Sequence, residues 1–271
     1  VFDYDPELFK WCRSIGFPYP TYSNDRMRRD WEKLCSYKND EYVPQCKLGM
    51  SIVKNFHPSI YDAQVRGSVS PKEAWYDDLK LKKVIANRLI YKNDVDPSKV
   101  LQGFNISKTC PCVSLFNPVL ARYLVNTYIP ELSEVFDPFS GFSGRLLGVA
   151  STGRKYVGQD INANHVQESN NVISHFNLRN CSVTQADVLN STGSYECLLT
   201  CPPYLNKEVY GSESVFKSCD EWVDECLSRF RCKRYVFVVD ETEKYQRNVC
   251  MTIKNSSHLN TNMEHVIVID L

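Results

Sequence analysis

Two short segments carry residues suited to binding and chemistry, DPFSGFSG at 137–144 and TCPPY at 200–204. In the first, Gly141 and Gly144 permit a tight turn and a close backbone approach to a ligand. A helix that follows such a loop presents free N–H groups to the ligand. Because glycine turns occur at many strand–helix junctions, this segment alone indicates only a general binding loop.

Two acidic residues follow at the expected ends of the next two strands. Asp160 lies nineteen residues after Gly141, where a carboxylate can accept hydrogen bonds from ribose hydroxyls. Asp187 falls at the end of the next predicted strand, in a place to meet an adenine ring. Together with the glycine loop, these acids predict a nucleoside ligand.

The TCPPY segment ends a further predicted strand. Its two prolines fix φ and remove two N–H donors, which leaves backbone carbonyls free to point into a pocket. Tyr204 offers a flat face for stacking. A rigid carbonyl beside an aromatic ring suits a planar base whose exocyclic amine donates hydrogen bonds. The alternative is an ordinary rigid turn, for which Pro-Pro-Tyr is also typical.

The second part of the chain alternates strands with helices, which predicts an α/β fold around a mostly parallel sheet. In such a sheet, ligands bind beyond the carboxyl ends of the strands, where both segments lie. The predicted strands are 135–137, 155–161, 182–188, 196–200, 235–240 and 265–270. The predicted helices are 144–151, one from Asn162 with Val166, Ile173 and Phe176 on one face, and one capped by Asp220 that carries Trp222 and Phe230.

Residues 1–105 differ in character from residues 106–271, which predicts two regions. The first region is aromatic and mixed in charge, and it contains one clear helix signal. Ser70, Pro71 and Glu73 form a capping box with proline in the first turn. We expect one helix to continue from there, with its apolar face formed by Trp75, Leu79, Val84, Ile85 and Leu89.

DPFSGFSG followed by TCPPY resembles the S-adenosylmethionine-dependent amino methyltransferases of DNA, which modify adenine N6 or cytosine N4. In that family a D-P-F-x-G-x-G loop binds the cofactor, and a (Asp/Asn/Ser)-Pro-Pro-(Tyr/Phe/Trp) loop holds the flipped base. FNPVLARYL at 116–124 resembles the family's other cofactor-flanking element. The resemblance covers about residues 113–271. Within the family, the chain resembles the methyltransferases of phages and of restriction–modification systems. It implies a Rossmann-like methyltransferase fold, with the first region as a mixed or helical accessory part.

The resemblance also implies a role for each matching residue. The residues that would cradle the methionine part of S-adenosylmethionine are Asp137, Phe139, Gly141 and Gly144. The nucleoside part would bind to Asp160 through the ribose and to Asp187 through the adenine edge, and the pocket would be closed by Phe116 and Pro118. The residues that would bind the target amine are Cys201, Pro202, Pro203 and Tyr204. The implied reaction is direct methyl transfer to a flipped base, without a metal.

Cys201 departs from the family pattern. The family has Asp, Asn or Ser there, whose oxygen accepts a hydrogen bond from the amine, whereas a thiol is a poor acceptor. Cysteine is nearly isosteric with the serine of the cytosine-N4 enzymes, so it can act in the same way, or it can mark weak activity or an unusual substrate. A nucleophilic Cys201 is a lesser alternative, because the sequence shows no neighbouring histidine or base.

The recognition of DNA would fall to residues 1–105. Only sixty residues separate Gly141 from Cys201, and predicted strands and helices use them. The candidate phosphate contacts are Arg26, Arg28, Arg29, Lys80, Lys82 and Lys83. The alternative for each of them is a solvated surface charge.

Composition limits the remaining classes. Lys and Arg balance Asp and Glu at 32 each, so no overall basic charge marks a nucleic-acid binder. No apolar stretch reaches the roughly 20 residues that cross a bilayer, and no signal peptide is evident. The 12 cysteines lack paired zinc spacing and are expected to be reduced thiols. We therefore expect a non-secreted protein, in the cytoplasm of a bacterial or phage-infected cell or at the nucleoid.

Several alternatives stay open at this point. The sequence does not choose between adenine and cytosine, and it leaves open a homodimer, a partner subunit and a longer parent chain. A methyltransferase acting on RNA or on another amine fits the same motifs. So does a non-catalytic nucleic-acid-binding subunit that keeps the fold, for which Cys201 is the best support and the intact cofactor loop the best counter-argument.

Overall fold

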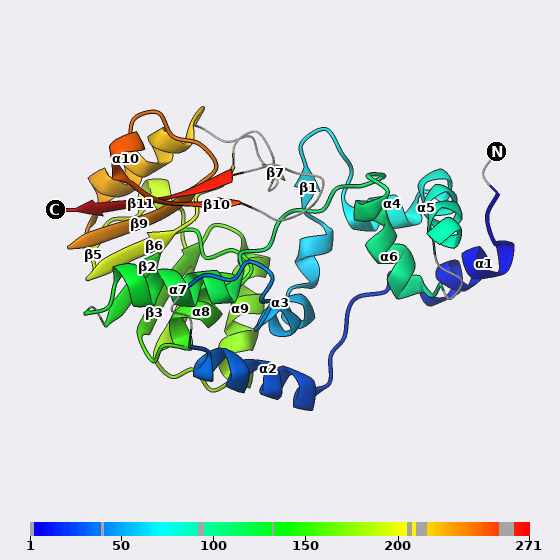
Figure 1. Cartoon of the computed structure of the whole chain (residues 1–271), viewed down its shortest axis with the longest axis horizontal. Helices are drawn as coiled ribbons and strands as arrows, with labels where there is room; N and C mark the ends of the chain where they lie inside the picture. The colour runs from blue at the N-terminus through cyan, green and yellow to red at the C-terminus, as the bar shows by residue number, and fades with distance from the viewer. Residues whose placement is uncertain are drawn as a thin grey trace. The chain divides into compact units, whose positions relative to one another are not determined.

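The computed structural model describes residues 3–38, 41–91, 95–131, 133–204, 208–209, 216–254 and 263–271. The chain forms two compact units, shown with their elements in Figure 1. We call the first the helical unit; it comprises Val1–Thr21, Pro58–Ser114 and Asn206–Glu213. We call the second the sheet unit; it comprises Tyr22–His57, Leu115–Leu205 and Ser214–Leu271.

A seven-stranded sheet forms the centre of the sheet unit, in the order β10-β11-β9-β6-β2-β3-β4. Five neighbouring strands are parallel, and β11 runs antiparallel between β9 and β10. The strands are β2 (Glu134–Asp137), β3 (Lys155–Asp160), β4 (Cys181–Gln185), β6 (Cys197–Thr200), β9 (Arg234–Val239), β10 (Val249–Lys254) and β11 (Met263–Asp270). The expected α/β architecture with a mostly parallel sheet is confirmed.

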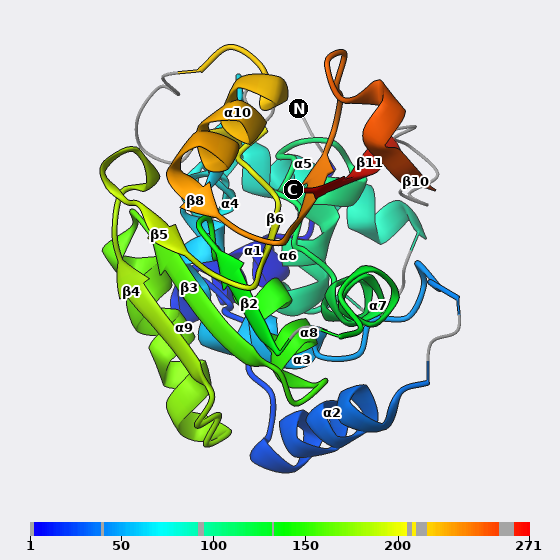
Figure 2. The ribbon, with the colours of Figure 1, turned by 90° about the vertical axis from the view of Figure 1, so that its left-hand side faces the viewer.

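Helices cover both faces of this sheet. α10 (Cys219–Arg229) lies on one face, and α7 (Pro118–Tyr128), α8 (Gly144–Ala150) and α9 (Ala163–His175) lie on the other (Figures 1 and 2). From β2 the chain proceeds outward to β3 and β4 and then returns to β6 on the other side of β2. The carboxyl ends of β2 and β6 therefore border a topological switch point, where open α/β sheets bind ligands.

Buried apolar side chains hold the sheet and α10 together. β9 reads RYVFVV, and every residue after Arg234 is buried, as expected of a central parallel strand. Phe136 of β2 packs in the same cluster as Trp222 of α10 and Phe237 of β9. The short β5 (Gly193–Ser194) and β8 (Phe230–Arg231) pair beside this cluster, where Tyr195 stacks on Phe136 at 3.8 Å between ring centroids.

Two helices from the N-terminal part of the chain also belong to the sheet unit. They are α2 (Asn24–Ser36) and α3 (Met50–Phe56). Ser23 caps α2, because its side chain accepts a hydrogen bond from the Arg26 N–H. This division differs from the predicted boundary at residue 105, since 22–57 pack with the sheet and 106–114 with the helical unit.

The helical unit has its own apolar core. Its helices are α1 (Pro6–Ile15), α4 (Pro71–Tyr76), α5 (Asp78–Tyr91) and α6 (Pro97–Ile106), with η1 (Pro58–Tyr61) and the pair β1 (Gln64–Val65) and β7 (Glu208–Val209). Trp75 and Phe104 are fully buried at the centre of this core. Gly103 lets α6 approach α5 closely, because a Cβ there would lie 2.7 Å from Val84 Cγ1.

The long helix predicted from Pro71 is wrong, although its capping box is confirmed. The helix ends at Tyr76, the backbone of Asp77 is extended, and α5 begins at Asp78. The Asp77 side chain accepts hydrogen bonds from the N–H groups of Leu79 and Lys80, and so caps the new helix. Leu79 is consequently 72% exposed and does not belong to the predicted apolar face.

The predicted helices from Asn162 and near Asp220 both form, but two details differ. Asn162 does cap α9, yet the buried residues of α9 are His165, Glu168, Ser169 and Val172 rather than the predicted apolar face. Ser218, not Asp220, caps α10. Asp220 instead accepts hydrogen bonds from the loop at 242–244 that precedes η3 (Gln246–Asn248).

Among the described residues, no helix combines the length and the apolar character that a membrane crossing requires.

Candidate active site

The predicted cofactor and target segments meet at the carboxyl ends of three adjacent strands. Asp137 is the last residue of β2, Asp160 is the last residue of β3, and TCPPY begins at Thr200, where β6 ends. β2 pairs in parallel with both β3 and β6, so these three ends lie at one edge of the sheet. The structure therefore brings the glycine loop and the TCPPY loop together at the switch point.

Asp137 is fully buried and makes its hydrogen bonds within the protein. Its Oδ1 accepts from the Thr200 hydroxyl at 2.6 Å, and its Oδ2 accepts from Arg145 Nε at 2.7 Å and from the Tyr156 hydroxyl at 2.8 Å. The Phe139 N–H donates to Oδ1 at 3.2 Å. The carboxylate thus has four partners, about as many as its oxygens can accept. In this structure it joins β2, β3, β6 and α8, and its predicted contact with the methionine part stays a prediction.

Arg145 is the buried cation that balances Asp137, and sequence reasoning did not identify it. Its guanidinium also donates to the Phe139 carbonyl and lies 5.0 Å from the centroid of the Phe116 ring. Burial lowers the pKa of Arg145, but Asp137, Cys201 and Tyr156 raise it by more, so the side chain is charged. The same charge lies within electrostatic reach of Cys201 at the start of the target loop.

The glycine loop is held in a left-handed turn. Gly141 has φ 54°, and its N–H donates to Asp160 Oδ2 at 2.8 Å. Ser143 has φ 60°, which is uncommon for a residue with a side chain. Gly144 serves a packing role, because a Cβ there would lie 2.1 Å from the Phe116 carbonyl oxygen. Its absent side chain lets the segment before α7 lie against the start of α8.

Asp160 and Asp187 hold neighbouring turns after β3 and β4. Asp160 accepts from the N–H groups of Gly141 and Asn162 and contacts His165 at 3.4 Å. Burial raises the pKa of Asp160, but His165 and the backbone donors outweigh it, so the pKa is lowered and the carboxylate is ionised. Asp187 is half-buried, and its side chain caps the short helix η2 (Val188–Asn190). Each carboxylate oxygen can accept more than one hydrogen bond, so both acids fit the roles predicted for them.

Phe116, Pro118 and Phe139 flank this edge of the sheet. Phe116 is half-buried, with the Arg145 guanidinium over its ring. Pro118 is buried in the first turn of α7, behind the Asn117 cap, and packs near Gly49. Phe139 meets Trp222 edge to face with ring centroids 4.9 Å apart. Pro118 therefore supports the loop from behind rather than lining an open surface.

A buried polar network connects α3, the glycine loop and α9. His57 follows α3 and is fully buried; its Nδ1 lies 3.0 Å from Glu168 Oε2 and its Nε2 lies 2.8 Å from Ser143 Oγ. Burial lowers the pKa of His57, an effect larger than the opposing one of Glu168, so the ring is neutral. A neutral ring donates to the carboxylate from Nδ1 and accepts at Nε2, so Ser143 donates to His57 and Ser169 donates to Ser143 at 2.9 Å.

Glu168, His57 and Ser143 have the order of a hydrolytic triad, but they cannot act as one here. Ser143 has no exposed surface, so no substrate can reach its hydroxyl. Ser143 also starts α8 from a left-handed conformation, which the two hydrogen bonds to its side chain stabilise. The network therefore positions the glycine loop.

The buried face of α9 carries a signal that hydrophobic periodicity overlooks. His165, Glu168, Ser169 and Val172 follow helical spacing, so three polar residues occupy a face that packs inward. Polar groups are buried at a cost unless they are hydrogen-bonded, so such a face indicates a network or a site. His57 lacks any comparable local signal, because its partners lie 86 and 111 residues further along the chain.

The TCPPY loop differs from expectation at Tyr204. Tyr204 is 6% exposed and packs in the cluster with Trp222, and its hydroxyl donates to Glu264 Oε1 of β11 at 2.7 Å. In this structure the ring does not present an open stacking face. The Cys201 Sγ lies 3.3 Å from the Tyr204 hydroxyl oxygen. The thiol is the donor in this pair, because the phenol donates its own proton to Glu264. Pro202 is buried and Pro203 half-buried.

The six predicted phosphate contacts fall in different units. Arg26, Arg28 and Arg29 lie on α2 of the sheet unit, whereas Lys80, Lys82 and Lys83 lie on α5 of the helical unit. Several of them have acidic partners: Arg28 with Asp25, Lys80 with Asp77, and Lys82 with Asp78. Among the described residues, the structure gives no ion pair to Arg26, Arg29 or Lys83.

No protein-family model and no curated protein matches the sequence. Solved structures are similar to part of the chain. TrmN from Thermus thermophilus is 15% identical over 57% of this chain and 48% of its own, with a TM-score of 0.44. The human methyltransferase 10 domain containing protein is 12% identical over 56% and 80%, with a TM-score of 0.40. The tRNA (uracil-54, C5)-methyltransferase of Pyrococcus abyssi, solved with S-adenosyl-L-homocysteine, is 16% identical over 59% and 40%, with a TM-score of 0.42. The match thus spans about half or less of the first and third of these chains.

The fold itself belongs to a defined class. Five parallel strands with the switch point beside β2, the antiparallel β11 and helices on both faces form a Rossmann-like methyltransferase fold. The predicted fold class is therefore confirmed. S-adenosylmethionine is the cofactor that this fold implies.

Replacing Asp137 should destabilise the fold. Asp137→Asn removes the charge that balances buried Arg145, and breaking a buried pair costs about 3–5 kcal/mol. Urea unfolding followed by circular dichroism measures this loss. Asp25→Asn is the matched control, because it breaks the exposed Asp25–Arg28 pair and should cost at most about 1 kcal/mol. Equal losses in the two variants would show that Asp137 does not carry this role.

Replacing His57 should weaken cofactor binding more than it weakens the fold. His57→Gln keeps a donor and an acceptor but loses the rigid ring that spans Glu168 and Ser143. We therefore expect the affinity for S-adenosylhomocysteine, measured by calorimetry, to fall about tenfold, or about 1.4 kcal/mol. His175→Gln, at an exposed position, is the control and should leave it unchanged.

The lowered pKa of His57 adds a pH signature. The folded state resists protonation of this ring, so the wild type should lose stability as pH falls below the unfolded pKa of about 6.5. His57→Gln should lack that part of the loss. An unchanged affinity together with an unchanged pH profile would contradict the positioning role.

Proposed function

We propose that the chain transfers a methyl group from S-adenosylmethionine to the exocyclic amine of a flipped base in DNA, cytosine N4 or adenine N6. One observation carries this proposal: the glycine loop after β2 and the TCPPY loop after β6 meet at the switch point of a methyltransferase fold. A cofactor site and an amine-holding loop are therefore adjacent, as the reaction requires.

The residues at the ends of β2, β3 and β4 fit the cofactor. The carboxylate of Asp160 is ionised and can accept hydrogen bonds from ribose hydroxyls. The loop around Gly141 offers backbone at close range, and Asp187 lies beyond β4, the neighbour of β3. When bound, S-adenosylmethionine supplies an electrophilic methyl group on a positively charged sulfur.

The target loop has acceptors suited to an amine. The backbone carbonyl of Pro202 and the sulfur of Cys201 can each accept one amine hydrogen, which turns the nitrogen lone pair toward the methyl group. In the transfer the N–C bond forms as the S–C bond breaks, and the extra amine proton leaves to water. The Cys201 thiol already donates its hydrogen bond to the Tyr204 hydroxyl. Toward the amine, its sulfur would therefore act as a hydrogen-bond acceptor.

The buried ring of Tyr204 sets one requirement for base binding. A base can stack on it only after the side chains packed around Tyr204 move away, and the hydrogen bond to Glu264 is one contact that holds the phenol in place. We expect Tyr204 to stack on the base once the loop opens. Unstacking the target base from the duplex costs a few kcal/mol in base-flipping enzymes generally.

Nucleoside mass spectrometry tests the reaction. Duplex DNA incubated with the protein and methyl-labelled cofactor should yield labelled N4-methylcytosine or N6-methyladenine. Cys201→Ser should raise the turnover number, since oxygen is the better acceptor, and Cys201→Ala should lower it at least about tenfold, since one hydrogen bond is lost. Cys250→Ser, at an exposed thiol, is the control.

The outcomes separate the alternatives. Label in RNA but not in DNA would move the substrate to RNA, and a small-molecule amine would be the next class to test. Cofactor binding without label in any nucleic acid would contradict the enzyme proposal for this chain and favour a non-catalytic binding subunit.

A further inference from the structure

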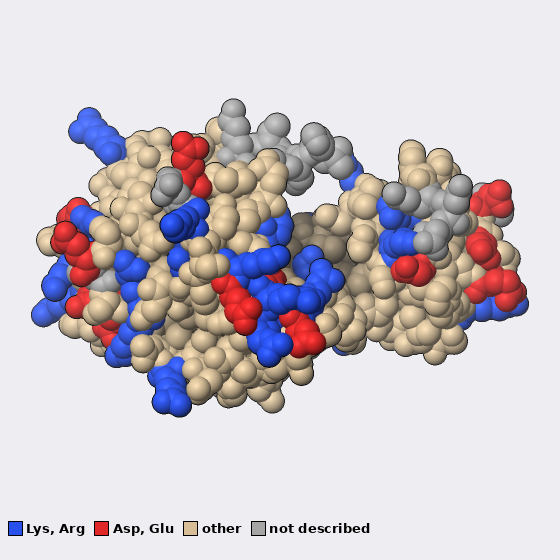
Figure 3. Space-filling model, turned by 60° about the horizontal axis from the view of Figure 1, so that its bottom comes forward, with Lys and Arg blue, Asp and Glu red and all other residues tan. Residues whose placement is uncertain are grey.

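The sheet unit has a concave basic pocket between α2 and the start of α3. Its volume is about 360 Å³. It is lined by Tyr22, Arg26, Arg29, Asp30, Lys33, Lys47, Leu48, Met50, Ser51 and Lys54. Figure 3 shows Lys and Arg side chains gathered on the face where α2 comes forward, with a few acidic side chains among them. Five of the ten lining residues are cations, and one is an acid.

The one acid in this pocket, Asp30, is too few to balance the five cations. Asp30 Oδ2 accepts from both the N–H and the hydroxyl of Ser51, at 3.2 and 2.5 Å, which ties α2 to α3. Within the part of the chain that the structure describes, none of the five cations has an ion-pair partner. The pocket therefore carries an excess of about four positive charges.

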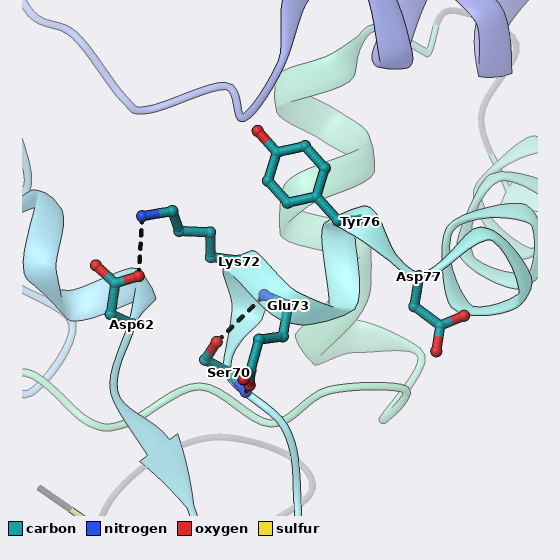
Figure 4. A pocket seen from close by; sticks show the side chains of 6 residues that line it. All are labelled: Asp62, Ser70, Lys72, Glu73, Tyr76 and Asp77. Carbon is teal, nitrogen blue, oxygen red and sulfur yellow. Dashed lines mark hydrogen bonds and ion pairs between the residues drawn. The ribbon is translucent and has the colours of Figure 1, made fainter. Parts of the chain in front are cut away.

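A second pocket, in the helical unit, shows the opposite arrangement. It is lined by Asp62, Ser70, Lys72, Glu73, Tyr76 and Asp77 (Figure 4). Lys72 pairs with Asp62 at 3.0 Å, and Glu73 completes the capping box with Ser70. Its charges are satisfied within the protein, so an excess of unpaired cations is particular to the first of these two pockets.

The cations of the basic pocket come from two sides. Arg26, Arg29 and Lys33 are spaced three and four residues apart, so they follow one face of α2 over about 10 Å. Lys47 and Lys54 reach the pocket from the segment around α3. The Arg26 guanidinium lies 4.5 Å from the centroid of the Tyr22 ring, a cation–π contact that orders it.

We propose that this pocket binds the phosphate backbone of the nucleic-acid substrate, an inference that rests on the proposed function. A row of cations along a helix face matches a row of phosphates, and such contacts position a nucleic acid without reading its sequence. The set differs from the one predicted from the sequence: it adds Lys33, Lys47 and Lys54, and it leaves out Arg28, Lys80, Lys82 and Lys83.

α3 places this pocket near the cofactor loop. Met50, Ser51 and Lys54 line the pocket, and His57, directly after α3, holds Ser143 of the glycine loop. The helix has seven residues and so spans about 10 Å. Phosphates bound in the pocket would therefore lie one short helix away from the loop that holds the methyl donor.

The salt dependence of binding tests this assignment. We compare Arg29→Ala/Lys33→Ala/Lys54→Ala with the control Lys38→Ala/Arg179→Ala/Lys233→Ala, which removes the same charges from exposed positions of the sheet unit. Fluorescence anisotropy with a labelled duplex DNA and a labelled RNA hairpin, without cofactor, gives affinity against salt concentration. Each lost phosphate contact lowers the slope of log K against log salt by about 0.9 on duplex DNA.

The pocket variant should lose a slope of about 2–3 and at least about tenfold in affinity at low salt, while the control should stay within about twofold. Arg29→Lys/Lys33→Arg/Lys54→Arg keeps the charges and should keep the slope, which separates charge from folding. Equal losses in the pocket and control variants, or no loss in either, would overturn the proposal. Loss of binding to phosphatidylserine vesicles with unchanged binding to DNA and RNA would also overturn it, because the pocket would then serve a membrane surface.

The two proposals can fail separately. The anisotropy assay needs no methyl transfer, so a pocket-dependent slope with no labelled base leaves the pocket supported and contradicts the proposed enzyme. Labelled base with an unchanged slope supports the enzyme and contradicts the pocket. Competition by inorganic pyrophosphate should weaken binding of the wild type far more than that of the pocket variant; equal competition would count against the pocket.

Discussion

The buried pair of Asp137 and Arg145 is the interaction on which the candidate site depends. Through Thr200 the Asp137 carboxylate also holds the carboxyl end of β6, and through the Tyr156 hydroxyl it holds β3. Arg145 also donates a hydrogen bond to the Phe139 carbonyl in the glycine loop. Removing one member of such a pair leaves a buried charge without compensation. The loops proposed to hold the cofactor and the base thus share one electrostatic anchor.

A second constraint comes from the N-terminal part of the chain. Residues 22–57 pack with the sheet, and His57 supplies the hydrogen bond that stabilises the left-handed Ser143. The glycine loop therefore needs a residue that lies far from it in the sequence. The same segment carries the basic pocket, so substrate phosphates and the cofactor loop would be served by one short helix.

Local patterns predicted six of the seven strands of the main sheet, the glycine loop and the TCPPY loop, because strand ends, glycine turns and Pro-Pro-Tyr are short-range features. They missed β10 at the edge of the sheet. They could not predict Arg145, which lies in a helix that otherwise reads as apolar. Nor could they predict the burial of Tyr204, whose ring packs in the cluster with Trp222 and whose hydroxyl bonds to Glu264 on a strand sixty residues away. The helix broken at Asp77 shows a further limit: a side chain that caps the next helix overrides a continuous apolar pattern.

The most direct test of this account is a calorimetric titration of the chain with S-adenosylhomocysteine, beside Asp160→Ala and an exposed control, Asp25→Ala. The account predicts binding at one site for the wild type and the control, and an affinity at least about tenfold lower for Asp160→Ala with its circular dichroism spectrum unchanged. No binding by the folded wild type, or the same affinity in all three proteins, would contradict a nucleoside cofactor at the ends of β2 and β3.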